Sequence, residues 1–190
     1  VNGGASALGN QRSLSFSLAP TDRIYGSGPR SISLDLRGRS FDLWNTQSFG
    51  YGGPLATMNA NVPFFLFSSN MAVLIDHWYR GHADMGASNP DRWTYDVSNG
   101  EVTYYVMAGT YLQELIDLYT LLTGRPSLPP RWTLGYIQSK FGYQNAAEAR
   151  TTATMLRSLG IPADGLVLDL YWFQNMGDLS WNTSAWPDPP

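Results

Sequence analysis

The sequence predicts a mixed fold, in which an antiparallel β-sandwich is followed by a parallel α/β portion. Residues 1–109 contain short alternating or apolar segments separated by turn residues, with no helix between them. After residue 109 the apolar period becomes helical, and a strand–helix–strand order follows. The Pro-rich stretch "RPSLPPRW" separates the two patterns. We therefore expect a sandwich over residues 1–109, a linking helix and connector over 110–130, and an α/β portion over 131–190.

Five stretches predict the strands of the first region. "RSLSFSLA" and "SISLDLRG" alternate with period two, and Ile32, Leu34 and Leu36 share one face of the second. "RIYGSGPRS" between them is typical of a glycine-rich structural turn. "VPFFLFSS" and "MAVLIDHW" predict a hairpin. "RWTYDVSNGEVTYYVMAG" predicts a second hairpin, with Asn99-Gly100 as its turn.

Two helices are expected in the rest of the chain. The first, "TYLQELIDLYTLLTG", has capping-box spacing between Thr110 and Gln113 and a stop signal at Gly124. Its apolar face is formed by Leu112, Leu115, Ile116, Tyr119 and Leu122. The second helix begins at the cap Asn145, has Glu148 at the third helical position and closes at Gly160. The strands "WTLGYIQS" and "ADGLVLDL" flank it, so these two strands are expected to be parallel.

Composition excludes several classes of function. The net charge is −3 with no basic cluster, so no nucleic-acid partner is expected, and the longest apolar run, "VPFFLF", is too short for a membrane span. There is no cysteine, which excludes disulfides and thiolate chemistry. His77 and His82 lack metal-ligand spacing, and no cofactor motif occurs, so we expect neither a metal nor a cofactor. The 14% aromatic content fits a core first and carbohydrate binding second. The first residues, "VNGGAS", are not typical of a natural start, and the last, "WPDPP", are not typical of a natural domain end, so we expect a piece of a longer chain.

Candidate site residues follow the two parallel strands, because ligands collect at the carboxyl ends of such strands. Asp169 ends a buried strand, so its carboxylate either meets a ligand or is satisfied by neighbouring groups. Asp164 begins the same strand and lies roughly 16 Å away, too far for a catalytic carboxylate pair. Asp178 follows in a loop that nothing forces back toward Asp169, and Asp188 in "WPDPP" is typical of a turn.

Several stretches, in this order, resemble glycoside hydrolase family 31, the α-glucosidase and α-xylosidase family. They are "RIYGSGPRS", "LDLRGRSFDLWNTQSFGYGG", "VPFFLFSS", "YTLLTGRPSLPPRWTLGYIQSKFGY" and "GIPADGLVLDLYWF". The resemblance implies a galactose-mutarotase-like β-sandwich packed on a (β/α)8 barrel that begins near Arg131. A whole barrel takes about 250 residues, so residues 131–190 are expected to form only its first βαβ portion.

The resemblance also implies retaining hydrolysis by two aspartates that lie on later barrel strands, so no catalytic residue is expected in this chain. Asp169 matches the aspartate that binds the hydroxyls of the sugar in this family, and Leu170 matches an apolar wall of that pocket. Phe141 matches an aromatic residue after the first strand. Gln47 stands where many members carry an aspartate on a loop of the sandwich, and Pro29 replaces a frequent glutamate. The neutral amide of Gln47 puts the preferred sugar in question.

The implied function is that of part of an α-glucosidase, with an α-transglucosylase of the same family as the alternative. A third alternative is that the isolated chain is a non-catalytic carbohydrate-binding or structural module. The expected partners are an oligosaccharide or α-glucoside substrate and the remainder of the chain's own barrel. The apolar residues of "YIQSKF" and "GLVLDL" are then expected to be exposed where the strands of the barrel stop. The lack of cysteine and the polymer-degrading relatives favour an extracytoplasmic bacterial enzyme.

Overall fold

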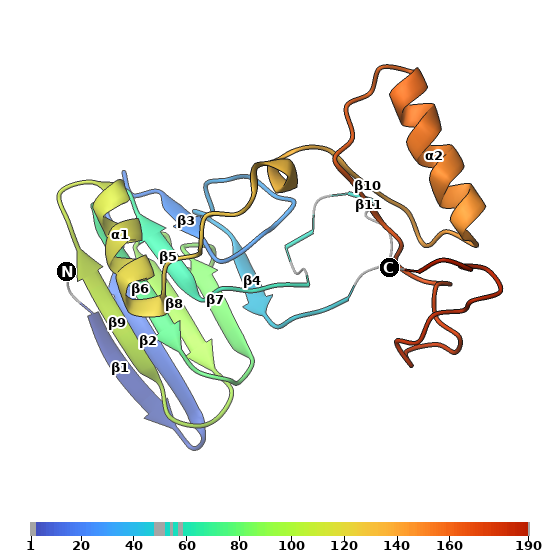
Figure 1. The fold of residues 1–190 in the computed structure, drawn as a ribbon. Coiled ribbons are helices and arrows are strands. Elements are labelled where there is room, and N and C mark those ends of the chain that lie inside the picture. The colour runs from blue at the N-terminus through green and yellow to red at the C-terminus, as the bar shows by residue number, and fades with distance from the viewer. Residues whose placement is uncertain (1–2, 48–51, 54, 57–58, 190) are drawn as a thin grey trace. The chain divides into compact units, whose positions relative to one another are not determined.

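A computed structural model describes residues 3–47, 52–53, 55–56 and 59–189. The chain divides into two compact units, Val1–Arg125 and Pro126–Pro190 (Figure 1). The first unit contains the two antiparallel sheets and the first helix, and the second contains the α/β portion with its parallel strand pair. Each unit is described by itself below.

The first unit is a sandwich of two antiparallel sheets, as the sequence predicts (Figure 1). The five-stranded sheet has the order β1 (Gly3–Leu8), β2 (Gln11–Ser17), β8 (Arg92–Val97), β7 (Gly81–Met85) and β4 (Ser40–Leu43). The four-stranded sheet has the order β3 (Ile24–Gly26), β5 (Phe64–Phe67), β6 (Met71–Asp76) and β9 (Thr103–Ala108). The predicted hairpin of β5 and β6 is confirmed.

The core of the sandwich lies between the two sheets and is built on aromatic rings. Trp93 of β8 is fully buried, and its ring contacts Phe65 and Phe67 of the opposite sheet edge-to-face, at centroid distances of 5.2 and 5.9 Å. Alternate residues of β2, β8, β5 and β6 point into this layer because side chains alternate across a strand. Edge-to-face pairs of this kind contribute about 0.5–1.5 kcal/mol beyond the area they bury.

The second predicted hairpin is wrong, although both of its strands exist. β8 pairs with β2 over six residues and with β7 over five, whereas β9 pairs with β6 in the other sheet. Both edges of β8 are therefore hydrogen-bonded, and no edge is left for β9. The Asn99-Gly100 turn carries the chain from one sheet to the other.

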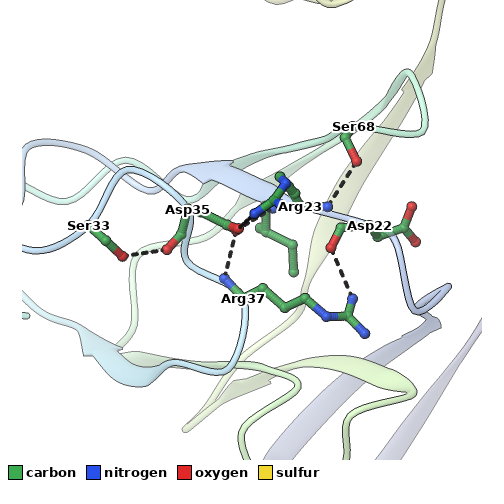
Figure 2. Close-up of polar contacts among 7 residues, drawn as sticks. Asp22, Arg23, Ser33, Asp35, Arg37 and Ser68 are labelled. Carbon is green, nitrogen blue, oxygen red and sulfur yellow. Dashed lines mark hydrogen bonds and ion pairs between the residues drawn. The ribbon is translucent and has the colours of Figure 1, made fainter.

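The strand predicted from "SISLDLRG" is also absent. The carboxylate of Asp35 instead accepts hydrogen bonds from backbone N–H groups within and near this segment (Figure 2). Oδ1 of Asp35 accepts hydrogen bonds from the backbone N–H groups of Ile24 and Arg37, at 3.2 and 3.1 Å, and Oδ2 pairs with Arg23 at 2.7 Å. Side-chain bonds of this type compete with a strand ladder. Leu36 is buried, but Leu34 is 80% exposed, so the alternation does not mark one buried face.

Four strands, β1, β3, β4 and β7, were not predicted, and β3 lies within the stretch "RIYGSGPRS" that was expected to be only a turn. β4 begins only after the Asp35 turn, and it pairs with β7 along the edge of the five-stranded sheet. β1, β4 and β7 contain no β-branched residue, so propensity does not reveal them, and β3 is only three residues long.

Helix α1 (Leu112–Thr123) covers the outer face of the four-stranded sheet. Leu115 is fully buried against that sheet, and the Tyr119 ring stacks on Phe64 at 4.2 Å. The predicted capping box is wrong, because Tyr111 occupies the cap position and Glu114 instead accepts the backbone N–H of Thr110 at 2.8 Å. Gly124 ends the helix as predicted, with φ of 98°.

The second unit confirms the predicted strand–helix–strand order. Strands β10 (Ile137–Ser139) and β11 (Gly165–Val167) are parallel, and α2 (Ala146–Ser158) connects them. The cap is the predicted one, since Oδ1 of Asn145 accepts the backbone N–H of Glu148 at 2.9 Å. The first strand is shorter than expected because residues 131–134 form a 3-10 helix.

The two parallel strands expose much of their apolar surface, as expected for the first portion of a barrel. Tyr136, Ile137 and Val167 are each more than a third exposed. Two strands cannot bury both of their faces, so these side chains lack the neighbours that further strands supply. No helix formed by the described residues is long and apolar enough to span a membrane.

Candidate functional site

Two loops meet at the carboxyl ends of β10 and β11. Phe141 follows β10 and is 67% exposed, and its ring lies edge-on to Tyr171 at 6.4 Å. Gly142 makes this approach possible, because a Cβ at this position would lie 2.6 Å from Cδ2 of Tyr171 and 2.9 Å from the Leu170 carbonyl oxygen. The structure therefore brings Phe141 beside the segment that carries Leu170.

Asp169 presents its carboxylate to solvent. It follows β11 and has the left-handed φ of 59°, which aspartate tolerates better than most residues. Its carbonyl oxygen accepts a hydrogen bond from Nε1 of Trp172 at 3.0 Å, which fixes the turn. Among the described residues, no group donates a hydrogen bond or forms an ion pair to the Asp169 carboxylate. Both of its oxygens are therefore free to accept hydrogen bonds from a ligand.

A cluster of aromatic side chains packs against the turn that carries Asp169. Trp186 is buried, and its Nε1 donates to the Tyr171 carbonyl oxygen at 3.3 Å. The Trp172 and Trp181 rings lie 4.8 Å apart, and both contact the small core formed by Tyr143, Ala149 and Trp186. Leu170 is half-buried. The turn therefore rests on rigid rings although it lies outside regular structure.

The other acids of the second unit have different partners or positions. Asp178 accepts the backbone N–H groups of Asn175 and Ser180 at 3.0 Å each, and the bond from Ser180 lowers the pKa of Asp178. Asp178 is therefore a loop-capping residue. Asp164 lies at the opposite end of β11 from Asp169, where its backbone N–H donates to the Tyr136 carbonyl oxygen at 2.8 Å.

Lys140, next to Phe141, is drawn toward the helix. Its ammonium pairs with Glu148 of α2 and lies 4.9 Å from the centre of the Tyr143 ring. Glu148 also accepts the backbone N–H of Gln144 at 2.7 Å. Both charges are therefore used to fix the first turn of α2 near the loop that carries Phe141.

Gln47 belongs to the first unit and is exposed on the segment that follows β4. The remainder of its loop includes residues 48–51, which lie outside the described residues. Arg30 ties the start of this segment to the sandwich. Its Nη2 donates to Oδ1 of Asn61 at 2.7 Å, and Nδ2 of Asn61 donates to Oδ1 of Asn45 at 2.9 Å.

Arg30 was not singled out from the sequence, where the "YGSGPR" turn looked purely structural. Its guanidinium lies 3.9 Å from the centre of the Phe41 ring and also donates to both oxygens of Ser27. Burial lowers the pKa of Arg30 to about 10, so it remains a cation at neutral pH. A half-buried arginine directly after a glycine-rich turn leaves no periodic signal that sequence patterns could detect.

The two histidines take part in separate pairs. Nε2 of His77 lies 3.0 Å from the hydroxyl of Tyr95, and His82 lies between Asp42 and Ser40, at 2.7 and 2.8 Å. Across the residues that the structure describes, no group of three histidine, aspartate or glutamate side chains is placed to hold a metal ion.

Comparisons with known proteins agree with this architecture. Residues 3–84 match the family model described as the glycosyl hydrolase 31 N-terminal galactose mutarotase-like domain. Residues 126–190 match the model described as the glycosyl hydrolases family 31 TIM-barrel domain. The two matches fall in the first and second units, respectively.

The chain is also similar to curated glycosidases and to a solved structure of a family 31 enzyme. The chain is 29% identical over 171 residues to alpha-glucosidase 2 of Bacillus thermoamyloliquefaciens, covering 88% of this chain and 22% of the relative. It is 30% identical over 183 residues to alpha-xylosidase XylQ of Lactiplantibacillus pentosus, covering 92% and 23%. The structure matches a family 31 dextranase of Flavobacterium johnsoniae, solved in complex with glucose, with a TM-score of 0.90 at 27% identity over 96% of this chain and 22% of that one.

The chain thus spans less than a quarter of the length of these relatives. Its sandwich corresponds to their N-terminal mutarotase-like domain, and its βαβ portion corresponds to the start of their barrel. On these matches and this architecture, the chain belongs to glycoside hydrolase family 31.

Proposed function

We propose that this chain is part of a retaining α-glycoside hydrolase that releases terminal α-linked glucose from oligosaccharides. The observation that carries the proposal is the exposed, unpartnered carboxylate of Asp169 at the carboxyl end of β11, with Phe141 at the end of β10. Ligands of parallel α/β folds bind at this edge. The α-glucosidases among the relatives support the choice of glucose.

In this proposal the residues of the chain hold and orient the sugar. Asp169 accepts hydrogen bonds from two neighbouring hydroxyls, and a charged acceptor makes such bonds stronger than neutral ones. Leu170 forms an apolar wall, and the exposed ring of Phe141 offers a face for the C–H groups of the sugar. Gln47 on the sandwich contributes a neutral amide, which can donate as well as accept.

The bond-breaking acids of the proposed mechanism are two aspartates, one acting as nucleophile and the other as general acid and base. We assign neither to this chain, because Asp164 lies at the other end of β11 from Asp169 and Asp178 caps its own loop. The 190-residue chain by itself is therefore proposed to be inactive. The proposed division is a sandwich over 1–109, a linking segment over 110–130 and the start of the barrel over 131–190.

The test is Asp169→Asn in the complete enzyme. Asparagine keeps the shape of the side chain and removes its charge, so we expect kcat/KM for a chromogenic α-glucoside to fall at least tenfold, since a charged hydrogen bond contributes about 1.5–3 kcal/mol. The thermal unfolding temperature should not change, because the carboxylate has no partner within the described residues. Asp188→Asn, a change at another exposed acid of the same unit, is the matched control. Equal activity of Asp169→Asn and the control would contradict the assigned role.

A second candidate is an α-xylosidase, which the 30% identity to XylQ favours. Xylose lacks the hydroxymethyl group of glucose, so the two sugars differ in the space they need. Rates of the complete enzyme on chromogenic α-glucoside and α-xyloside separate the two activities. The third candidate, an α-transglucosylase, is recognised by the longer oligosaccharides that it forms from maltose in place of free glucose.

A further inference from the structure

The first unit contains an open cleft at the end of the sandwich, with a volume of about 380 Å³. It lies between the segment that follows β4, the turn from β6 to β7, and Tyr95 of β8. The volume is at the lower end of the range for small-ligand sites. None of the assigned sugar-binding residues lines this cleft.

Three aromatic rings on the wall of the cleft are accessible to a ligand. Trp78 is 94% exposed, and Trp44 and Tyr79 are each about half exposed. Tyr79 is held in place because Gly100 has no side chain: a Cβ there would lie 2.4 Å from Cε2 of Tyr79. A single exposed aromatic residue is ordinary, but three on one concave surface offer flat apolar faces to a ligand.

The floor of the cleft is polar and has one free donor, the amide of Asn45. The Tyr79 backbone N–H donates to Nδ1 of His77 at 3.1 Å, so the proton of the neutral ring is on Nε2 and is donated to the Tyr95 oxygen at 3.0 Å. Tyr95 is fully buried, so its hydroxyl lies beneath the surface of the cleft and is not a donor to a ligand. Nδ2 of Asn45 has no acceptor among the described residues, since the bond from Asn61 uses only its Oδ1. Gly81 makes room for the hydroxyl, because a Cβ there would lie 2.0 Å from it.

The cleft carries no formal charge at neutral pH. Burial lowers the pKa of His77, which keeps this ring neutral, and the other lining residues are apolar, amide or aromatic. A phosphate, a carboxylate or a cation would lose hydration on entering and would gain no opposite charge. A neutral ligand with hydroxyl groups and an apolar face matches both the amide donor of Asn45 and the rings.

We propose that this cleft binds an uncharged pyranose ring, a glucosyl unit of an α-glucan, which stacks on the exposed aromatic rings and accepts a hydrogen bond from Asn45. The choice of glucose rests on the proposed function, whereas the choice of a neutral pyranose rests on the cleft itself. A stacked sugar with few hydrogen bonds binds weakly, so a dissociation constant on the order of millimolar is expected.

The test uses the 190-residue chain labelled with 5-fluorotryptophan, which reports each of its seven tryptophans by fluorine NMR. Single substitutions assign the resonances. Titration with maltotriose should shift the Trp78 and Trp44 signals, and Trp78→Ala should weaken the effect seen at Trp44 about tenfold or more. Trp78→Ala should fold normally because the side chain is almost fully exposed. Trp132→Ala, at an exposed tryptophan of the second unit, is the matched control and should leave the titration unchanged.

Sorbitol is the control ligand, because it has hydroxyl groups but no ring face. No shift with maltotriose, an equal shift with sorbitol, or a titration at Trp44 that is unaffected by Trp78→Ala would each overturn the proposal. Asp169→Asn should leave the Trp44 and Trp78 shifts unchanged, because its carboxylate is not part of the cleft. The result at the cleft is thereby distinguishable from the outcome for the Asp169 site.

Discussion

Replacement of Arg30 by methionine tests how the sandwich holds the segment that leads to Gln47. Methionine keeps most of the apolar contact with Phe41 and removes the guanidinium, whose donors reach Ser27, Ala56 and Asn61. Both ends of this network are then affected, the glycine-rich turn after β3 and the loop before β5.

The expected change in the free energy of unfolding combines two effects. Hydrogen bonds are lost, and the desolvation cost of the charged group is removed. Bonds to a charged donor contribute about 1.5–3 kcal/mol each, but they are not additive. Removing a half-buried cation also relieves its desolvation cost. We therefore expect the free energy of unfolding to fall by about 2–4 kcal/mol, which corresponds to a decrease of roughly 1–2 M in the urea midpoint.

The assay is urea unfolding of the 190-residue chain, followed by circular dichroism. Arg92→Met is the matched control, because Arg92 lies on the same unit but is exposed and donates a single bond to Ser15, at 2.9 Å. The control should lower the free energy of unfolding by less than about 0.5 kcal/mol. Amide hydrogen exchange should also become faster at residues 44–47 in Arg30→Met, since Asn61 loses its anchor and holds Asn45 less firmly. Equal midpoints for Arg30→Met and Arg92→Met would refute this reasoning.

Three further changes test the packing, the helix cap and the electrostatics. Gly81→Ala should lower the free energy of unfolding by about 1–3 kcal/mol, because its methyl group collides with the Tyr95 hydroxyl, and an unchanged urea midpoint would contradict this overlap. Asn145→Ala removes the cap of α2 and should cost about 1 kcal/mol, measured as lower helical stability in urea, whereas Asn145→Asp should retain most of it. The hydrogen bond from Arg80, followed by that from His82, lowers the pKa of Asp42, so its stabilisation is present above the ordinary carboxyl pKa of about 3.8 and is lost as the pH falls through the lower folded value. The midpoint difference between the wild type and Asp42→Asn should accordingly be larger at pH 7 than at pH 3, and a difference independent of pH would argue against the pair.

The local signals of the sequence were reliable where neighbouring residues are sufficient to define the structure. The cap at Asn145, the helix end at Gly124 and the hairpin of β5 and β6 each depend on residues a few positions apart, and each is found where it was predicted. The parallel β10–β11 pair was also predicted, because a helix between two apolar strands has few other arrangements. The role of Asp169 in sugar binding remains a prediction.

The tertiary structure decided the features that depend on residues far apart in the chain. The separation of β8 from β9 depends on β2 and β7, which occupy both edges of β8. The absence of a strand around Asp35 depends on a backbone group of Ile24, and the cleft depends on two glycines that admit Tyr79 and Tyr95. The sequence by itself determined the order of the elements and the family resemblance, because both are written in local patterns. Only the folded chain determined the strand pairing and the cleft, because these arise from contacts between segments that no local pattern relates.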